Sequence, residues 1–160
     1  MDGILFALTL AGALGCGLSA GAFYAFSSFV MQGLGRLPPA QGLAAMQAIN
    51  VTAVTFAFML ALFGTTVVVA VLGVWAVTSW SEPYAPWLLA GAVLYLAGAI
   101  GVTMIFHVPR NDALATVDPA ASDAAARWRR YHSEWTAGNH VRTVAGLAAA
   151  AALTVALQAG

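Results

Sequence analysis

Four apolar stretches alternate with polar connections along the chain. They cover about residues 4–30, 51–77, 86–106 and 138–157. A helix needs about 20 apolar residues to cross the hydrocarbon core of a bilayer, and each stretch approaches or exceeds this length. The fourth is long enough only if it starts near Gly138, which places Arg142 about one turn inside the membrane. The pattern predicts an all-α integral membrane four-helix bundle, with residues 1–160 forming a single transmembrane domain.

The connections refine this prediction. Residues 31–50 are expected to form a loop that contains prolines, followed by a short helix over residues 41–50, while residues 78–85 form a tight turn. Residues 107–137 form the longest connection and carry most of the charge. Pro109 disfavours helical geometry at Val108, so the third span is expected to end there. Asp118, Ser122 and Asp123 predict a new helix start, and this helix continues through Trp135 into the fourth span.

Composition supports the membrane assignment. Charged residues make up 8% of the chain and apolar residues 61%, whereas soluble domains carry about 25% charged residues. The net charge is zero, which argues against a nucleic-acid partner, since such binding needs a basic surface. Cys16 is the single cysteine, so an internal disulfide and a metal site with several cysteines are excluded.

Arginine placement predicts the orientation. The chain has no lysine, and its six arginines lie in or beside the first and third connections. By the positive-inside rule, both connections face the cytoplasm and both termini lie outside an inner (cell) membrane. An even number of spans requires the first and third connections to share a side, so the arginine pattern and the count of four spans agree.

Small residues recur at intervals of four in two spans. In the first span they are Ala13, Gly17, Gly21 and Ala25, and in the fourth Ala148, Ala152 and Ala156. Such faces let helices approach closely in a bilayer, where lipid is as apolar as the helices themselves. We expect these faces to pack within the bundle, and a homodimer along one of them is the alternative.

Polar side chains gather near the cytoplasmic ends of the spans, where burial is costly and often signals function. Gln47 and Asn50 are expected to share a face at the start of the second span, and His107 and Asn111 flank Pro109. One helix face carries Trp128, Tyr131, Trp135, Asn139 and Arg142, with His132 and His140 beside it. Structural roles are the competing interpretation: the aromatic residues as interfacial anchors, Arg142 as a side chain that reaches the headgroups, and the amides as links between helices.

The three histidines also permit a metal hypothesis. His107, His132 and His140 would offer three nitrogen ligands for copper, iron or zinc. His132 and His140 are eight positions apart on one helix, about 80° around its axis, which makes joint ligation awkward. No hydrolase or nucleotide-binding motif accompanies them.

Several segments carry a family resemblance that runs along nearly the whole chain in order. They are residues 23–31, residues 45–50, Val108-Pro109-Arg110-Asn111-Asp112-Ala113-Leu114-Ala115, Trp128-Arg129-Arg130-Tyr131, Trp135-Thr136 and Asn139-His140-Val141-Arg142-Thr143. The chain resembles a family of small integral membrane proteins that includes the anthrone oxygenases. Two positions depart from the pattern that we expect of this family: His107 stands in place of Asn, and Gly138 in place of an aromatic residue.

The resemblance implies oxidation of a polycyclic phenol, or of a related aromatic or quinol, by dioxygen in the membrane. Deprotonation of such a substrate gives an electron-rich anion that can reduce dioxygen, so we expect no cofactor. His140 is the expected base and His107 the alternative. Asn139 and Arg142 would stabilise the developing oxyanion together with Gln47, Asn50 and Asn111, and Trp128, Tyr131 and Trp135 would stack on the substrate.

Two further hypotheses remain open at this point. The chain is alternatively a non-enzymatic membrane protein, either a small-molecule carrier or a subunit that stabilises a larger complex. A carrier often shows paired halves with broken helices, and no such internal repeat is present. The second alternative is an electron-transfer protein that binds haem, copper or iron through His107, His132 or His140.

Overall fold

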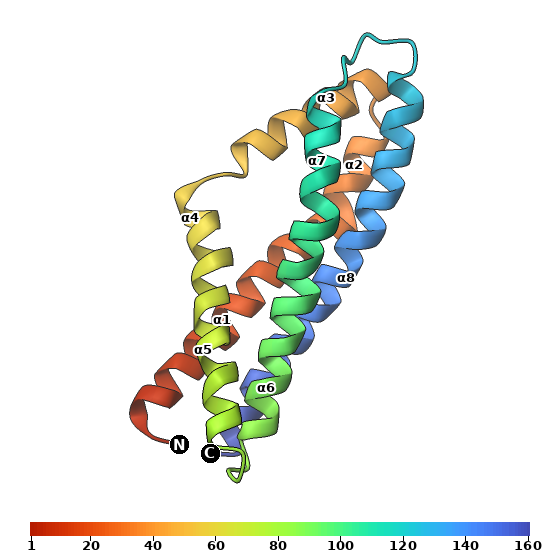
Figure 1. Cartoon of the computed structure of the whole chain (residues 1–160). Coiled ribbons are helices and arrows are strands. Elements are labelled where there is room, and N and C mark those ends of the chain that lie inside the picture. Colours follow the sequence, from red (N-terminus) through yellow and green to blue (C-terminus); the bar gives the residue numbers. More distant parts are fainter.

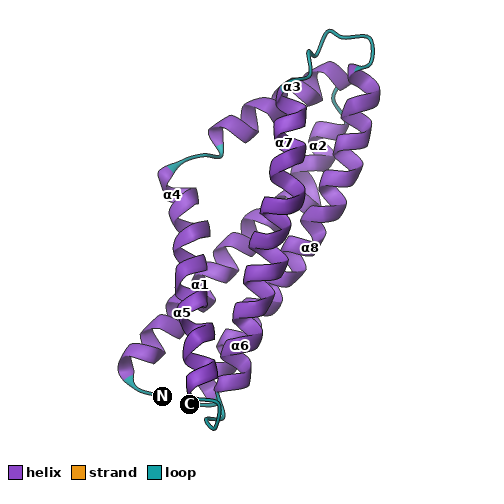
Figure 2. Ribbon diagram, in the orientation of Figure 1, coloured by secondary structure: helices purple, strands orange, loops and turns teal.

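The computed structural model describes all 160 residues and contains helices and loops but no strands (Figures 1 and 2). Four helices are long and apolar enough to cross a membrane, spanning Gly3–Gly35, Phe56–Thr78, Ala85–Ala115 and Ala124–Gln158. They lie side by side in one elongated bundle, as Figure 1 shows. The predicted all-α, multi-pass membrane architecture is therefore confirmed.

The first two long helices are assembled from shorter segments. The first consists of α1 (Gly3–Ala25), the π-helical η1 (Phe26–Val30) and α2 (Met31–Gly35). A separate helix, α3 (Pro39–Thr52), follows, and the second long helix consists of α4 (Phe56–Met59), η2 (Leu60–Gly64) and α5 (Thr65–Thr78). The chain breaks between α3 and α4, where the Thr55 hydroxyl accepts a hydrogen bond from the Phe58 amide and caps the new helix.

The third and fourth long helices carry most of the polar residues. The third consists of α6 (Ala85–Val93), η3 (Leu94–Gly101), η4 (Thr103–His107) and α7 (Val108–Ala115). The fourth, α8 (Ala124–Gln158), is one uninterrupted helix, as the sequence predicted, and begins directly after Asp123. It packs against the first and third long helices and against α3, and its most extensive contact is with α1.

Two span boundaries differ from the sequence prediction. The third long helix does not end before Pro109 but continues to Ala115. The wide π-helical turn of η4 ends at His107, two residues before the proline; such turns accommodate the proline ring and its missing N–H within a membrane helix. The second long helix begins at Phe56 rather than near residue 51, so Gln47 and Asn50 lie on α3 instead of at the start of that span.

Both chain termini lie at one end of the bundle, where the Met1 amino group donates a hydrogen bond to the Gly160 carbonyl oxygen at 3.0 Å. The connections before α3 and before α8 lie at the opposite end (Figure 1). We call this opposite end the arginine-rich end, because it carries Arg36, Arg110, Arg127, Arg129 and Arg130.

Close packing between small residues holds the half of the bundle near the termini. A β-carbon built on Gly146 of α8 would lie 3.0 Å from that of Ala20 on α1, so the two backbones are nearly in contact. The predicted packing of Gly17 and Gly21 is wrong, because a β-carbon on either would meet nothing within 4 Å. The face of α1 that packs in the bundle is displaced from theirs and includes Cys16 and Ala20. A homodimer along the Gly17 face stays a prediction.

Candidate functional site

One face of α8 carries the polar and aromatic residues that the sequence placed together. All five members of the predicted stripe are buried: Trp128, Tyr131, Trp135, Asn139 and Arg142. Steps of three and four residues keep side chains on the same side of a helix, and this side of α8 faces the bundle. The predicted stripe is therefore a real inward face, and it runs from the arginine-rich end towards the middle of the bundle.

Asn139 is the centre of a buried hydrogen-bond network. Its exposed fraction is 0%, and its Nδ2 donates to the Phe23 carbonyl oxygen and to Ser27 Oγ of the first long helix, both at 2.7 Å. Its Oδ1 accepts a 2.6 Å hydrogen bond from Nη2 of Arg142. Thr143 completes the network, since its hydroxyl lies 3.2 Å from Ser27 Oγ. The amide therefore has partners on both its nitrogen and its oxygen.

Arg142 is a buried cation without a carboxylate partner. Its exposed fraction is 6%, and none of the three ion pairs in the structure includes it. Besides Asn139, its guanidinium donates to Thr103 Oγ1 at 3.1 Å and stacks on the Phe23 ring at 4.3 Å. Its Nε is buried and has no hydrogen-bond partner. An uncompensated positive charge at this depth is costly and marks a functional site by default.

His107 lies next to this network and is 1% exposed. Its Nε2 is 3.2 Å from the carbonyl oxygen of Trp135, and its Nδ1 is 3.3 Å from that of Val102. A neutral imidazole carries only one N–H, so it donates to only one of these carbonyl groups. Uptake of a proton would let the ring donate to both. The ring is therefore held between two main-chain carbonyl groups, one on the third long helix and one on α8.

The structure does not bring the other two histidines into this site. His140, the base favoured by the sequence, is exposed, because it lies one residue beyond Asn139 and thus about 100° around the helix. His132 is half-buried, and its Nε2 lies 2.7 Å from the Met31 carbonyl oxygen. No group of three metal-binding side chains exists in the structure. The hypothesis of a site built from His107, His132 and His140 is therefore wrong.

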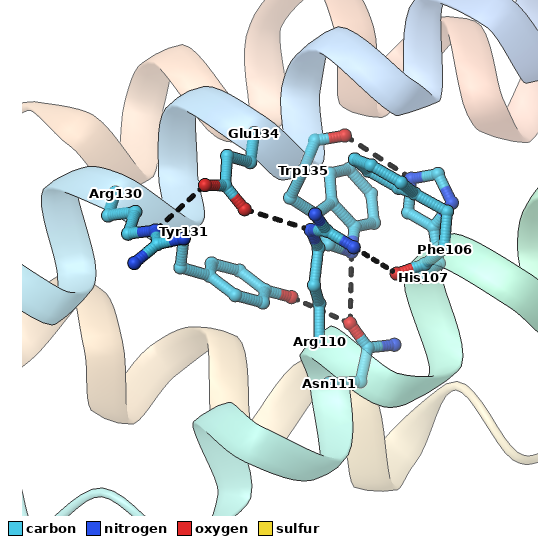
Figure 3. Close-up of polar contacts among 8 residues, drawn as sticks. All are labelled: Phe106, His107, Arg110, Asn111, Arg130, Tyr131, Glu134 and Trp135. Carbon is cyan, nitrogen blue, oxygen red and sulfur yellow. Dashed lines mark hydrogen bonds and ion pairs between the residues drawn. The ribbon is translucent and has the colours of Figure 1, made fainter.

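Asn111 links α7 to the aromatic part of the stripe. Its Oδ1 accepts hydrogen bonds from the Tyr131 hydroxyl at 2.8 Å and from the Trp135 indole N–H at 3.0 Å. The edge of the His107 ring packs against the Trp135 ring, with 5.0 Å between centroids. Figure 3 shows these side chains converging between α7 and α8. The aromatic residues are thus fixed in orientation as well as buried.

The two predicted amides on α3 lie apart from the Asn139 network. Gln47 donates from Nε2 to the carbonyl oxygens of Leu114 and Val117, both at 2.9 Å, and so ties α3 to the end of α7. Asn50 leaves a buried Nδ2 without a hydrogen-bond partner. Gln47 therefore has the contacts of a structural link between helices, whereas the buried Nδ2 of Asn50 is free to donate a hydrogen bond.

Two ion pairs that share one carboxylate lie at the arginine-rich end. Glu134 lies between Arg110 at 3.0 Å and Arg130 at 2.8 Å. The guanidinium of Arg110 also stacks on the Phe106 ring at 3.5 Å and donates to the Phe106 carbonyl oxygen at 3.1 Å (Figure 3). These contacts fix the Phe106 ring beside His107, at 5.3 Å between ring centroids.

The sequence interpretation missed three hydroxyl groups of the network: Ser27, Thr103 and Thr143. Thr143 follows Asn139 by four positions, and this spacing placed it on the inward face of α8. No comparable signal marked Thr103. The π-helical segments η3 and η4 interrupt the regular period of the third long helix, so the inward positions on it do not follow from spacing.

Comparisons with known proteins bear on the same residues. The family model described as anthrone oxygenase matches residues 56–152, which include His107, Asn139 and Arg142. No significant match is found among curated proteins or among solved structures. The family model covers more than half of the chain, and the chain therefore belongs to the anthrone oxygenase family.

Proposed function

We propose that this protein is a membrane oxygenase that uses dioxygen to oxidise an acidic CH₂ group of a polycyclic phenol or a related aromatic compound. The observation that carries the proposal is the uncompensated guanidinium of Arg142, buried beside Asn139 and His107. A site with a fixed positive charge and a proton acceptor suits a substrate that becomes an anion during the reaction. Membership of the anthrone oxygenase family supports the same chemistry.

His107 is the proposed base. An anthrone carries an acidic CH₂ group opposite its carbonyl group, and removal of one proton gives a phenolate-like anion. The ring nitrogen of His107 that carries no hydrogen has a lone pair, which can take up this proton. The carbonyl oxygens of Val102 and Trp135 would then accept hydrogen bonds from both ring nitrogens.

Arg142 is proposed to stabilise the negative charge that develops on the substrate oxygen, and Asn139 to position Arg142. The free Nε–H of Arg142 is available to donate, and Asn139 and Thr103 hold the guanidinium in place. Donors fixed before the reaction need no reorganisation in the transition state, which is the usual basis of oxyanion stabilisation. The free Nδ2 of Asn50 and the amide of Asn111 are proposed to contact parts of the substrate other than this oxygen.

The reaction balances without a further reductant. The substrate anion transfers one electron to dioxygen, and the resulting radical and superoxide combine to form a carbon–oxygen bond. Protonation gives a hydroperoxide on the former CH₂ carbon. Loss of the second hydrogen of that carbon as a proton, with departure of hydroxide from the O–O bond, gives the new carbonyl group and one water. One substrate and one dioxygen thus yield one quinone and one water.

Oxygen uptake by the purified protein tests this proposal. We expect uptake above background with at least one member of a panel of anthrones and hydroquinones, and equal amounts of quinone formed and dioxygen consumed. A chelator in parallel samples separates chemistry carried by the chain from chemistry of a weakly bound metal. If no substrate in the panel raises uptake while the protein remains folded, the oxygenase proposal fails, and co-purifying partners become the evidence to pursue.

A further inference from the structure

An apolar groove runs along the outside of the bundle between the third long helix and α8. Its volume is about 630 Å³, within the range of small-molecule sites. It is open sideways, on the face that a bilayer would cover. The residues that form its walls and floor include Ala97, Gly101, Phe106, Ala137, Gly138 and Val141.

The floor of this groove includes Gly138 of α8. A β-carbon on Gly138 would lie 2.5 Å from Cε1 of Phe106 and 3.1 Å from Cε1 of His107, so only a glycine lets both rings pack here, and the Phe106 ring lies between the groove and the imidazole. The hydrogen bond between Arg142 and Thr103 joins the same two helices on their inner side. The groove and the polar site therefore lie on opposite sides of one helix pair.

One end of the groove is a fixed aromatic wall. The Phe106 ring contributes to the groove, and the Arg110 guanidinium stacks on it at 3.5 Å (Figure 3). Glu134 holds Arg110 in turn, through a 3.0 Å ion pair. An aromatic ring held in this way offers a flat surface for offset stacking of another ring.

We propose that this groove is a binding site that takes up a planar polycyclic phenol from the bilayer and holds it against the Phe106 ring, beside His107. The proposal rests on the proposed function and adds to it the position and the shape of the substrate site. A planar ring system is the occupant that fits an apolar groove with small residues at Ala97, Gly101 and Ala137 and a fixed aromatic ring on one wall. The substrate thus enters the groove from the bilayer without crossing water, and the Phe106 ring separates it from His107.

A cysteine at Val141 reports occupancy of the groove without any requirement for turnover. Val141 lines the groove and is exposed, whereas the native Cys16 is buried and should not react. We expect 1,8-dihydroxyanthraquinone, a planar compound already at the quinone level, to slow labelling of V141C by a membrane-permeant maleimide at least about tenfold in vesicles. V144C, exposed on α8 but outside the groove, is the control and should label at an unchanged rate.

A second variant fills the groove. Ala137 is exposed on its wall, so Ala137→Trp should leave the core intact and raise the KM for a tricyclic substrate by about tenfold or more. Val144→Trp should change KM less than about twofold. In the labelling experiment, stearate replaces the anthraquinone as a control, which tests whether the groove binds any acyl chain.

The outcomes separate this proposal from the oxygenase proposal. Unchanged labelling of V141C, equal protection by stearate, or an unchanged KM in Ala137→Trp would each overturn the groove assignment, even if the protein consumes dioxygen. Protection of V141C by the anthraquinone, without protection by stearate, would support the groove even if no oxygen uptake is found. In that case the proposed reaction fails and the binding site stands.

Discussion

The two halves of the bundle are stabilised in different ways. Near the termini, buried apolar and small residues such as Leu72, Leu88, Ala149 and Leu153 form one large cluster. Towards the arginine-rich end, a second, smaller apolar cluster is joined by Asn139, Arg142 and aromatic residues on the inward face of α8 that bond to other helices. Close packing alone is sufficient to hold membrane helices together, so the polar half is more costly than a structural role requires.

This difference indicates which half of the bundle carries groups suited to chemistry. The half near the termini uses side chains whose exchange for others of similar volume would leave the fold unchanged. The polar half fixes a cation, an amide and an imidazole relative to one another. The comparison leads to three predictions about stability, given from the largest effect to the smallest.

Loss of the Asn139 side chain should have the largest effect. Asn139→Leu removes the partners of Ser27, of the Phe23 carbonyl oxygen and of one Arg142 nitrogen. Leaving buried polar groups without partners should cost about 2–3 kcal/mol, seen as a lower Tm in detergent. Thr154→Ala is the matched control, because that hydroxyl is exposed and bonds only to the Ala150 carbonyl of its own helix. Equal Tm values for the two variants would show that the network does not stabilise the fold.

Crowding the close-packed half of the bundle should have the second-largest effect on stability. The β-carbon of Gly98→Ala would overlap that of Ala145 on α8, so η3 and α8 must move apart. Overpacking of this kind costs about 1–3 kcal/mol. Gly21→Ala serves as the control, since open space surrounds that position and alanine favours the helix. A Gly98→Ala protein as stable as Gly21→Ala would show that this contact is looser than described.

Loss of a surface ion pair should have the smallest effect. Glu134→Gln removes the negative charge between Arg110 and Arg130, and all three side chains are partly or fully exposed. Pairs of this kind contribute at most about 1 kcal/mol, so Tm should change little. Arg110 would nevertheless be held less firmly, and with it the Phe106 ring on which it stacks. We therefore expect the anthraquinone to protect V141C from labelling less well in this variant. A large fall in Tm would instead place these two ion pairs among the main stabilising contacts.

Hydropathy and helical period predicted much of this molecule. Spans of about 20 apolar residues follow directly from the thickness of a bilayer, so the four helices were evident. The inward stripe from Trp128 to Arg142 was predicted because α8 is regular throughout. The same regularity places His140 outside that stripe, next to Asn139, so the evidence against His140 as the base was already present in the spacing.

The features that the sequence did not predict lie where the helical backbone is irregular. The third long helix contains two π-helical segments before Pro109, and each shifts the direction in which later side chains point. For this reason neither the burial of His107 nor the position of Thr103 followed from the sequence. The break before Thr55 likewise assigns Gln47 and Asn50 to α3, which a hydropathy profile does not resolve.

Comparison of the two histidines by oxygen uptake tests the central claim most directly. His107→Ala should lower kcat/KM for an anthrone by about 10²–10⁴-fold, the usual contribution of a general base. His140→Ala should stay within about twofold of the unmodified protein, because that side chain points away from the site. If His140→Ala abolishes uptake while His107→Ala remains active and both proteins fold, the proposed site is wrong.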